Sequence, residues 1–268
     1  MDVINQYLNL SEGIIDSVRQ QREQIAQAAS WFAESILHGR MVHVFGSGHS
    51  RIMVEEMWPR YGSFPGFNPI VELSLTFHNL VVGANGQRQA MYLENVSGLA
   101  ERILRNYDIH PEDSALIISS SGTNIVPVEM GQWFYEHNVR TVALVTSQHL
   151  QASKSKRADD KKLDDFAHLV LDTGAPAGDA MIRIHGLESP VSPGSTVGGA
   201  LIINCIKAET ARILTLAGHP PKVLTAAVHV GPARAQELFE SAYDEHAHRL
   251  AKLYAHVGYP SYVSEKNT

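Results

Sequence analysis

The stretch that decides the fold is residues 115–124, with the sequence ALIISSSGTN. Its first four residues are apolar without alternation, which is typical of a strand buried on both faces of a parallel sheet. Three serines, a glycine, a threonine and an asparagine follow at once. These small polar residues predict a loop at the carboxyl end of the strand, before a helix that contains Met130 and Phe134.

The same arrangement occurs twice more along the chain. Residues 41–45 (MVHVF) precede the loop 46–50 (GSGHS), and residues 141–145 (TVALV) precede Thr146 and Ser147. Residues 67–72 and 168–171 are further candidate strands, and residues 181–184 are a candidate edge strand. Strands that alternate with helices predict a three-layer α/β/α fold around a mostly parallel sheet.

Helical periodicity fills the segments between these strands. The expected helices are one long amphipathic helix before residue 38, then 51–58, 93–104, 196–217, and a final one from Pro232 to near Gly258. Because no repeat or linker divides the chain, we predict a single domain over residues 1–268. Its expected parts are an N-terminal helix (1–38), a core (39–220) and a C-terminal helical extension (221–268).

Composition limits the classes of function. The 268 residues are 44% hydrophobic and 19% charged, which suits a packed core and not a disordered chain. The net charge of −6 argues against nucleic acid and anionic membranes as partners. The basic residues between Lys154 and Lys162 alternate with aspartates, which is typical of a solvated face.

The single cysteine and the termini bear on the compartment. Cys205 excludes an intrachain disulfide, and its apolar run (201–206) predicts a buried side chain. The first residues lack the pattern of a signal peptide, and the prolines and glycines of the uncharged run 189–206 do not suit a membrane span. We therefore expect a soluble, cytoplasmic protein in a reducing environment.

The three small-residue loops predict an anion site. Ligands of such sheets bind at the carboxyl ends of the strands, where helix N-termini offer free N–H groups. Ordinary turns and helix caps use the same residue types, so one such loop alone would mean little. Three loops of this kind at one sheet edge favour a site for a group of phosphate size.

These segments resemble the SIS (sugar isomerase) domain, the phosphosugar-binding fold of aldose–ketose isomerases and of some sugar-responsive regulators. The matching segments are residues 44–50, 113–124 and 142–147, and the second, in which Ser-x-Ser-Gly closes a strand, is the most specific. The resemblance covers roughly residues 35–220, and the chain is also similar to the phosphoheptose isomerases.

The resemblance implies a five-stranded, mostly parallel sheet of the flavodoxin-like kind, to which the predicted N- and C-terminal helices are added. It further implies a homodimer or homotetramer with sites near the subunit interface, and a phosphorylated or similarly anionic sugar as the ligand. The candidate ligand-binding residues are Gly46, Ser47, Gly48, His49, Ser50, Ser119, Ser120, Ser121, Gly122, Thr123, Asn124, Thr146 and Ser147.

Isomerisation through an enediol needs a base beside two neighbouring carbons, and in the family this base is usually a glutamate. The candidate catalytic residues are Glu56, Glu55, Glu72 and His78. Glu56 follows Ser50 by less than two helical turns and is expected to line the cleft, whereas Glu55 points about 100° away. A solvated charge is the competing interpretation for each glutamate, and a surface histidine for His78.

Other site types lack their motifs. Arg51 stands where a dinucleotide-binding loop needs its third glycine, and no P-loop, Gly-x-Ser-x-Gly elbow or His-Glu-x-x-His helix occurs. We therefore expect neither a metal nor a cofactor. The alternatives to a sugar-phosphate isomerase are a noncatalytic sugar-phosphate sensor and a phosphosugar lyase or etherase.

Overall fold

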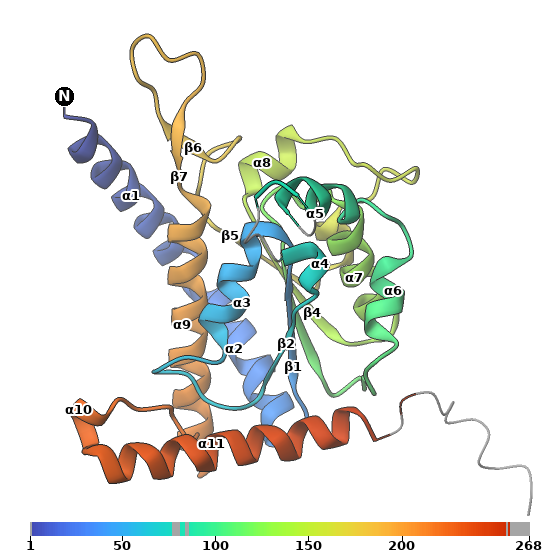
Figure 1. The fold of residues 1–268 in the computed structure, drawn as a ribbon, viewed down its shortest axis with the longest axis vertical. Coiled ribbons are helices and arrows are strands. Elements are labelled where there is room, and N and C mark those ends of the chain that lie inside the picture. The colour runs from blue at the N-terminus through green and yellow to red at the C-terminus, as the bar shows by residue number, and fades with distance from the viewer. Residues whose placement is uncertain (1, 77–80, 84–85, 256, 258–268) are drawn as a thin grey trace, which may run out of the picture.

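The structure, a computed structural model, describes residues 2–76, 81–83, 86–255 and 257. Its centre is a five-stranded sheet in the order β2-β1-β3-β4-β5, and every neighbouring pair of strands is parallel (Figure 1). The strands are β1 (Val42–Gly46), β2 (Phe67–Ile70), β3 (Ser114–Ile118), β4 (Arg140–Val145) and β5 (Leu169–Asp172). The predicted three-layer α/β/α fold is confirmed.

Side chains alternate between the two faces of the sheet, and each face packs on its own helices. Val42 and Val44 belong to the core beneath α2 (Arg22–Leu37), α3 (Arg51–Met57) and α9 (Ser195–Leu216). Phe45 and Ile117 point to the opposite core, beneath α6 (Leu99–Leu104) and α7 (Ile125–Glu136). With helices on both faces, β1 and β3 are buried throughout, as the unbroken apolar run 115–118 predicted for β3.

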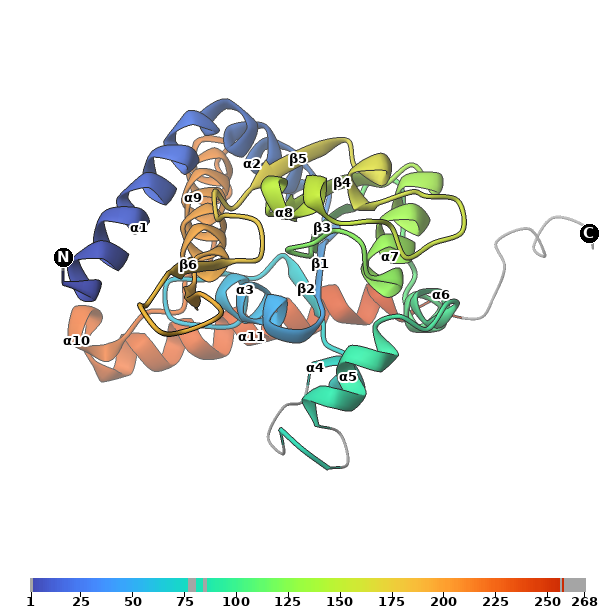
Figure 2. The same ribbon diagram turned by 90° about the horizontal axis from the view of Figure 1, so that it is seen from above.

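The strand order determines where a ligand can enter. β2 lies on one side of β1, whereas β3, β4 and β5 follow on the other side. The direction in which strands are added therefore reverses between β1 and β3. Loops on either side of such a point separate and leave a crevice at the carboxyl ends of the strands. Figure 2 looks onto this edge and shows α8 (Ser147–Ala152) over one part of it, while α4 (Leu73–Thr76) and α5 (Gln87–Leu93) project on the other side.

The N-terminal segment is two helices and not the single helix that was predicted. α1 (Val3–Gln20) is followed by Gln21, and α2 begins at Arg22. The Gln21 side chain donates to the Asp172 carbonyl oxygen (2.8 Å) and accepts from the Asp172 amide (2.7 Å). It thereby pairs with both backbone groups of the last residue of β5. Helical periodicity does not reveal a contact between segments so far apart in the sequence.

The helix predicted over residues 93–104 is also divided. α5 ends at Leu93 and α6 begins at Leu99, and between them Gly98 has a φ of +82°. The Glu129 carboxylate accepts from the Ser97 hydroxyl (2.5 Å) and the Gly98 amide (2.8 Å), which fixes the turn against α7. This interruption determines the position of Glu94, described below.

A two-stranded antiparallel hairpin stands beside the main sheet. Its strands are β6 (Ala180–Ile182) and β7 (Val191–Pro193), and Figure 1 shows it above α9 and next to α1. The predicted edge strand at 181–184 is therefore wrong, because β6 pairs with β7 and not with β5. The Tyr7 hydroxyl donates to the Pro193 carbonyl oxygen (2.8 Å) and joins the hairpin to α1.

The C-terminal helices lie at the opposite end of the sheet. α10 (Ala227–Val230) and α11 (Pro232–Leu253) cross below the amino ends of the strands (Figure 1), where Arg249 donates to the Arg40 carbonyl oxygen (3.0 Å) just before β1. α11 ends at Leu253, and Gly258, its expected end, lies outside the described residues. In the described part of the chain, no helix is both long and apolar enough to cross a membrane.

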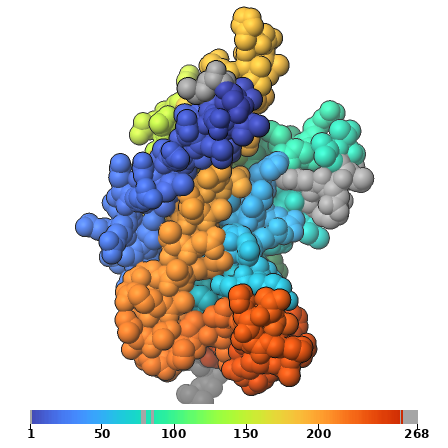
Figure 3. Space-filling model, turned by 90° about the vertical axis from the view of Figure 1, so that its left-hand side faces the viewer, coloured from blue at the N-terminus to red at the C-terminus, as the bar shows by residue number. Residues whose placement is uncertain are grey.

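Cys205 is exposed, which corrects the prediction of a buried thiol. The apolar run 201–206 belongs to α9, and a helix turns neighbouring residues to different sides. Ile202, Ile203 and Ile206 face the core, whereas Cys205 lines a groove together with residues of α1 and α2. Figure 3 shows α9 alongside these two helices on this face of the molecule.

Candidate active site

The first loop follows β1 and turns tightly into α3. A Cβ atom on Gly46 would lie 2.8 Å from the Ser50 backbone carbon and oxygen, so only glycine allows this close approach. Gly48 and Ser50 bound a short 3-10 turn, and Ser47 just before it is buried. The sequence thus bends the chain back over the end of β1 and turns the Ser47 hydroxyl inward.

The second loop follows β3 and leads into α7. Gly122 has a φ of +62°, and a Cβ atom there would lie 2.4 Å from Leu150 Cδ1. The Ser119 hydroxyl accepts from the Gly122 amide (3.2 Å), and the Ser121 hydroxyl accepts from the Thr123 hydroxyl (3.1 Å). The loop is therefore held by its own hydroxyl groups at the end of the central strand.

A chain of hydroxyl groups ties this loop to the neighbouring strand ends. The hydroxyl oxygens of Ser120 and Thr146 are 2.9 Å apart, and those of Thr146 and Thr173 are 2.7 Å apart. Thr146 is fully buried, so its hydroxyl supports the loop from beneath. Ser147 begins α8, and its amide donates to the Asp172 carboxylate (2.9 Å).

The two loops enclose a cavity of about 230 Å³ at the carboxyl ends of β1 and β3. The predicted residues that line it are Ser47, Gly48, His49, Ser50, Ser119, Ser120, Ser121 and Asn124. The other predicted residues of the three loops, which do not line it, are Gly46, Gly122, Thr123, Thr146 and Ser147. The prediction that the first two loops meet at the sheet edge is thus consistent with the geometry, while a role in binding stays a prediction.

The cavity also contains a carboxylate that was not among the predicted site residues. Glu94 lies between α5 and α6, and its Oε2 accepts from the Ser47 hydroxyl (2.8 Å). Its carbonyl oxygen accepts from the Val126 amide (2.9 Å) in the first turn of α7. The Glu94 backbone is therefore fixed to the helix after the second loop, and its side chain to the first loop.

The surroundings of Glu94 disfavour its charged form. Burial raises the pKa of the Glu94 carboxyl above its usual value, and the hydrogen bond from Ser47 and the charge of Lys156 offset this only in part. A carboxylate with a raised pKa in a cleft of this kind is a better proton acceptor than a fully solvated one.

Two further parts of the cavity wall carry polar groups. Asp179 accepts from the Ser195 amide (2.7 Å) and the Ser195 hydroxyl (2.9 Å), so it fixes the first turn of α9 and both residues line the cavity. His149 of α8 also lines it, and its buried Nδ1 has no hydrogen-bond partner among the described residues.

Comparison with known proteins assigns the family. A family model described as SIS domain matches residues 6–147. The chain is a member of the SIS family. A UPF0309 protein of Listeria monocytogenes is 28% identical over 222 residues, which cover 82% of this SIS protein and 87% of the relative. A UPF0309 protein of Halalkalibacterium halodurans is 31% identical over 218 residues, which cover 81% and 88%.

Among solved structures, a phosphoheptose isomerase from Francisella tularensis superimposes with a TM-score of 0.51 at 15% identity. The match covers 79% of this SIS protein and 97% of the isomerase. At this level of identity the likeness establishes the shared fold, which agrees with the parallel sheet and its flanking helices.

The predicted catalytic glutamates of this SIS protein do not line the cavity. Glu56 faces α9, where its Oε1 accepts from Asn204 (2.8 Å) and its Oε2 from Arg60. Lys207 Nζ lies 3.8 Å from Glu56 Oε1. Burial acts to raise the pKa of Glu56, but the hydrogen bonds from Asn204 and Arg60 and the charge of Lys207 lower it below its usual value.

The remaining catalytic candidates have other surroundings. Glu55 pairs with Arg51 on the exposed side of α3 (2.6 Å), and Glu72 accepts from the Ser74 hydroxyl (2.9 Å) at the start of α4. His78 lies outside the described residues. Catalysis by any of these candidates stays a prediction. Nothing in the sequence around Glu94 distinguished it, because its position depends on a turn held by α7.

A metal centre would need several ligating side chains close together. Within residues 2–76, 81–83, 86–255 and 257, no group of three or more His, Cys, Asp or Glu side chains is arranged to hold a metal ion. The cavity instead combines hydroxyl groups, one carboxylate of raised pKa and one histidine nitrogen without a partner.

Proposed function

We propose that this SIS protein binds a phosphorylated sugar in the cavity and interconverts its aldose and ketose forms through an enediol. The observation that carries the proposal is Glu94, a carboxylate of raised pKa beside the two small-residue loops. Under this proposal Glu94 is the base, in place of the glutamates of α3. The ligand enters from the carboxyl edge of the sheet, above β1 and β3.

The phosphate binds at the second loop. The hydroxyl groups of Ser119 and Ser121 lie there, and α7 begins directly after Asn124. The Asn124 side chain makes no capping hydrogen bond, the Val126 amide is used by the Glu94 carbonyl oxygen, and Pro127 has no N–H, so the Ile125 amide is the donor that the first turn of α7 offers to an anion. Binding through hydroxyl groups and backbone amides explains why these loops consist of small residues.

The proton transfer uses one oxygen of Glu94. Ser47 engages Oε2, so we assign the transfer to Oε1. Oε1 removes the proton from the carbon beside the carbonyl group. The electron pair of the broken C–H bond forms the carbon–carbon double bond of the enediol, while the π electrons of the C=O bond move onto the carbonyl oxygen. The hydroxyl proton moves between the two oxygens, and Glu94 returns its proton to the neighbouring carbon. No oxidant, reductant or metal is consumed.

The predicted assembly and location belong to the same proposal. The resemblance to the SIS family supports a homodimer or homotetramer with sites near the subunit interface. It also supports a cytoplasmic protein that acts on a soluble sugar phosphate.

Proton NMR in D₂O with a panel of aldose and ketose phosphates tests the activity. We expect deuterium beside the carbonyl carbon, together with interconversion of one aldose–ketose pair. Bond cleavage without interconversion would instead support the lyase alternative. A ligand-induced thermal shift without exchange for any member of the panel would support the sensor and contradict the isomerase.

The Ser121→Ala variant tests the site of phosphate binding. Loss of one hydrogen bond to a charged group is expected to weaken binding by about 1 kcal/mol or more. Ser192→Ala in the β7 hairpin strand, which does not line the cavity, is the matched control. Unchanged affinity of Ser121→Ala in thermal-shift titrations would contradict the assignment of the second loop.

A further inference from the structure

The charges of the cavity do not balance those of its proposed ligand. Among the described residues that line it, two are carboxylates, Glu94 and Asp179, and none is lysine or arginine. A sugar phosphate adds about −1.5 to −2 at neutral pH. Like charges within a few ångströms repel, more strongly where water is partly excluded. A cation from outside the lining is therefore needed near the second loop.

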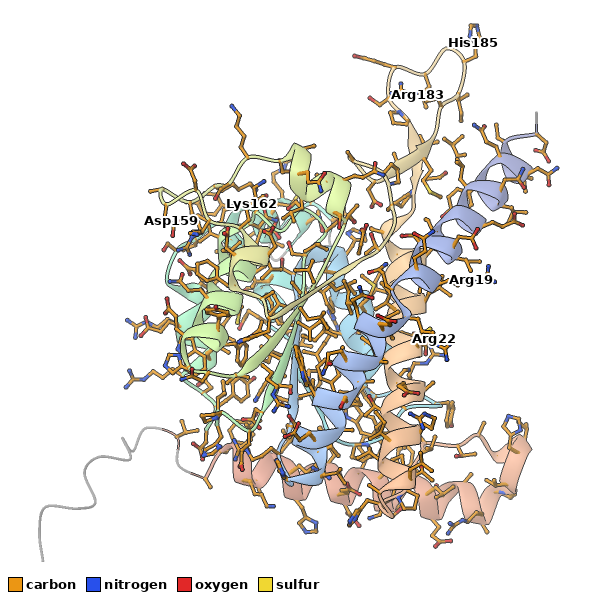
Figure 4. The ribbon with its side chains drawn as sticks, turned by 180° about the vertical axis from the view of Figure 1, so that it is seen from behind. Arg19, Arg22, Asp159, Lys162, Arg183 and His185 are labelled. Atoms are coloured by element: carbon orange, nitrogen blue, oxygen red, sulfur yellow. The ribbon has the colours of Figure 1, made fainter. Side chains whose placement is uncertain are left out.

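The basic cluster between Lys154 and Lys162 lies next to this loop. Figure 4 labels Asp159 and Lys162 on the segment that follows α8. Arg157 pairs with Asp159 (2.6 Å), and Lys161 pairs with Asp165 (3.2 Å). Lys162 Nζ donates to the Leu150 carbonyl oxygen (2.7 Å). Arg157 and Lys161 are thereby paired with carboxylates, and Lys162 is bound to the backbone of α8.

Lys156 differs from them because it reaches toward the cavity. Its Nζ donates to Asn124 Oδ1, and Asn124 lines the cavity at the start of α7. The partner oxygen is a neutral amide and not a carboxylate, so the ammonium charge is not neutralised by this contact. The same charge acts on Glu94 inside the cavity, which places it within electrostatic range of the bound ligand.

We infer that Lys156 is the cation that completes the anion site, by pairing its ammonium group with the phosphate at the second loop. The inference rests on the proposed function and adds the residue that selects a charged sugar over a neutral one. The flexible four-carbon stem of lysine allows the ammonium to move from Asn124 Oδ1 to a phosphate oxygen. Asn124 then holds Lys156 in position while the site is empty.

Binding of inorganic phosphate to the full chain tests this inference, measured by calorimetry at pH 8. We compare Lys156→Ala with Lys154→Ala, an exposed lysine two positions away. Lys156→Ala is expected to raise the Kd for phosphate about fivefold or more, because a charge-assisted hydrogen bond is lost. Lys154→Ala should change it less than about twofold, since a solvated charge contributes little.

Two further measurements separate charge from structure. Lys156→Arg keeps the cation and should restore most of the affinity. The dependence of the phosphate Kd on NaCl concentration should be weaker in Lys156→Ala than in the unaltered protein. If Lys156 acted only by supporting the structure, Lys156→Ala would leave the salt dependence of the phosphate Kd unchanged, and Lys156→Arg would not restore the affinity.

Failure of the inference is distinguishable from failure of the proposed function. If Lys156→Ala binds phosphate as the unaltered protein does while Ser121→Ala binds it less well, the role of Lys156 is overturned and the anion loop stands. If the unaltered protein does not bind phosphate, or if Ser121→Ala leaves binding unchanged, both the anion loop and the role of Lys156 are overturned.

Discussion

Glu94 and Glu56 both lie near the first loop, but their surroundings differ. Glu94 lines the cavity, accepts a hydrogen bond from the neutral Ser47 hydroxyl, and has a raised pKa because it is buried. Glu56 packs between α3 and α9, accepts from Arg60 and Asn204, and has a lowered pKa. Lys207, which is buried, adds a second cation beside Glu56.

The surroundings of a glutamate determine whether its side chain is suited to a structural contact or to proton transfer. Cations that stabilise the charge of Glu56 also make it a weaker base, and they suit it to joining two helices. A site that disfavours the charge of Glu94 makes it a stronger base and decreases the stability of the fold. Sequence position alone favoured Glu56, because it follows the first loop directly on a helix.

The largest expected effect is on catalysis. Glu94→Gln keeps the shape of the side chain and removes the base, so the exchange rate in D₂O should fall by about 10²- to 10⁴-fold. Glu56→Gln is the matched control and should keep most of the rate. An unchanged rate in Glu94→Gln together with a large loss in Glu56→Gln would reverse the two assignments.

The second effect is on stability. Glu56→Gln leaves the ammonium of Lys207 buried with only the residue 56 carbonyl oxygen and the Ser63 hydroxyl as acceptors. The free energy of unfolding at pH 7 should fall by about 2 kcal/mol, as measured by urea denaturation. A change below about 0.5 kcal/mol would show that the α3–α9 cluster contributes little.

The pH dependence of stability should differ in sign between the two positions. Glu56 has a lowered pKa, so its stabilising effect is present above pH 4.5, its unfolded value, and is lost as the pH falls through its folded pKa. Glu94 has a raised pKa, so stability is lost as the pH rises from 4.5 through its folded pKa.

Urea denaturation of the unaltered protein and of both glutamine variants between pH 3 and pH 8 measures these contributions. The advantage of the unaltered protein over Glu56→Gln should grow with pH. Its advantage over Glu94→Gln should shrink with pH. Slopes of the same sign would contradict the contrast between the two carboxylates.

The smallest effect concerns Ser47. Its hydrogen bond favours the charged form of Glu94, so Ser47→Ala should raise the pKa of Glu94 further. The acidic limb of the pH–rate profile should therefore move to higher pH. The plateau rate should change by less than about tenfold, because only one hydrogen bond is lost. Ser192→Ala, which lies outside the cavity, is the control and should leave the acidic limb in place.

The sequence predicted the features that depend on local patterns. Unbroken apolar runs marked β3 and β4, and small residues marked the loops that lie at their ends. Helix ends controlled by distant contacts were not predicted. Gln21 interrupts the N-terminal helix through its hydrogen bonds to β5, and Glu129 fixes the turn that separates α5 from α6.

The amino-acid sequence is sufficient to specify the parallel α/β sheet and the serine-rich loop at its carboxyl edge, because strand burial and turn formation depend on residues close together in the chain. Which carboxylate enters the cavity, and which side of α9 carries Cys205, follow only from the folded arrangement. Both depend on packing between segments far apart in sequence, and burial there sets the pKa of Glu94. A glutamate becomes a candidate base through the groups that surround it, and only the folded chain brings those groups together.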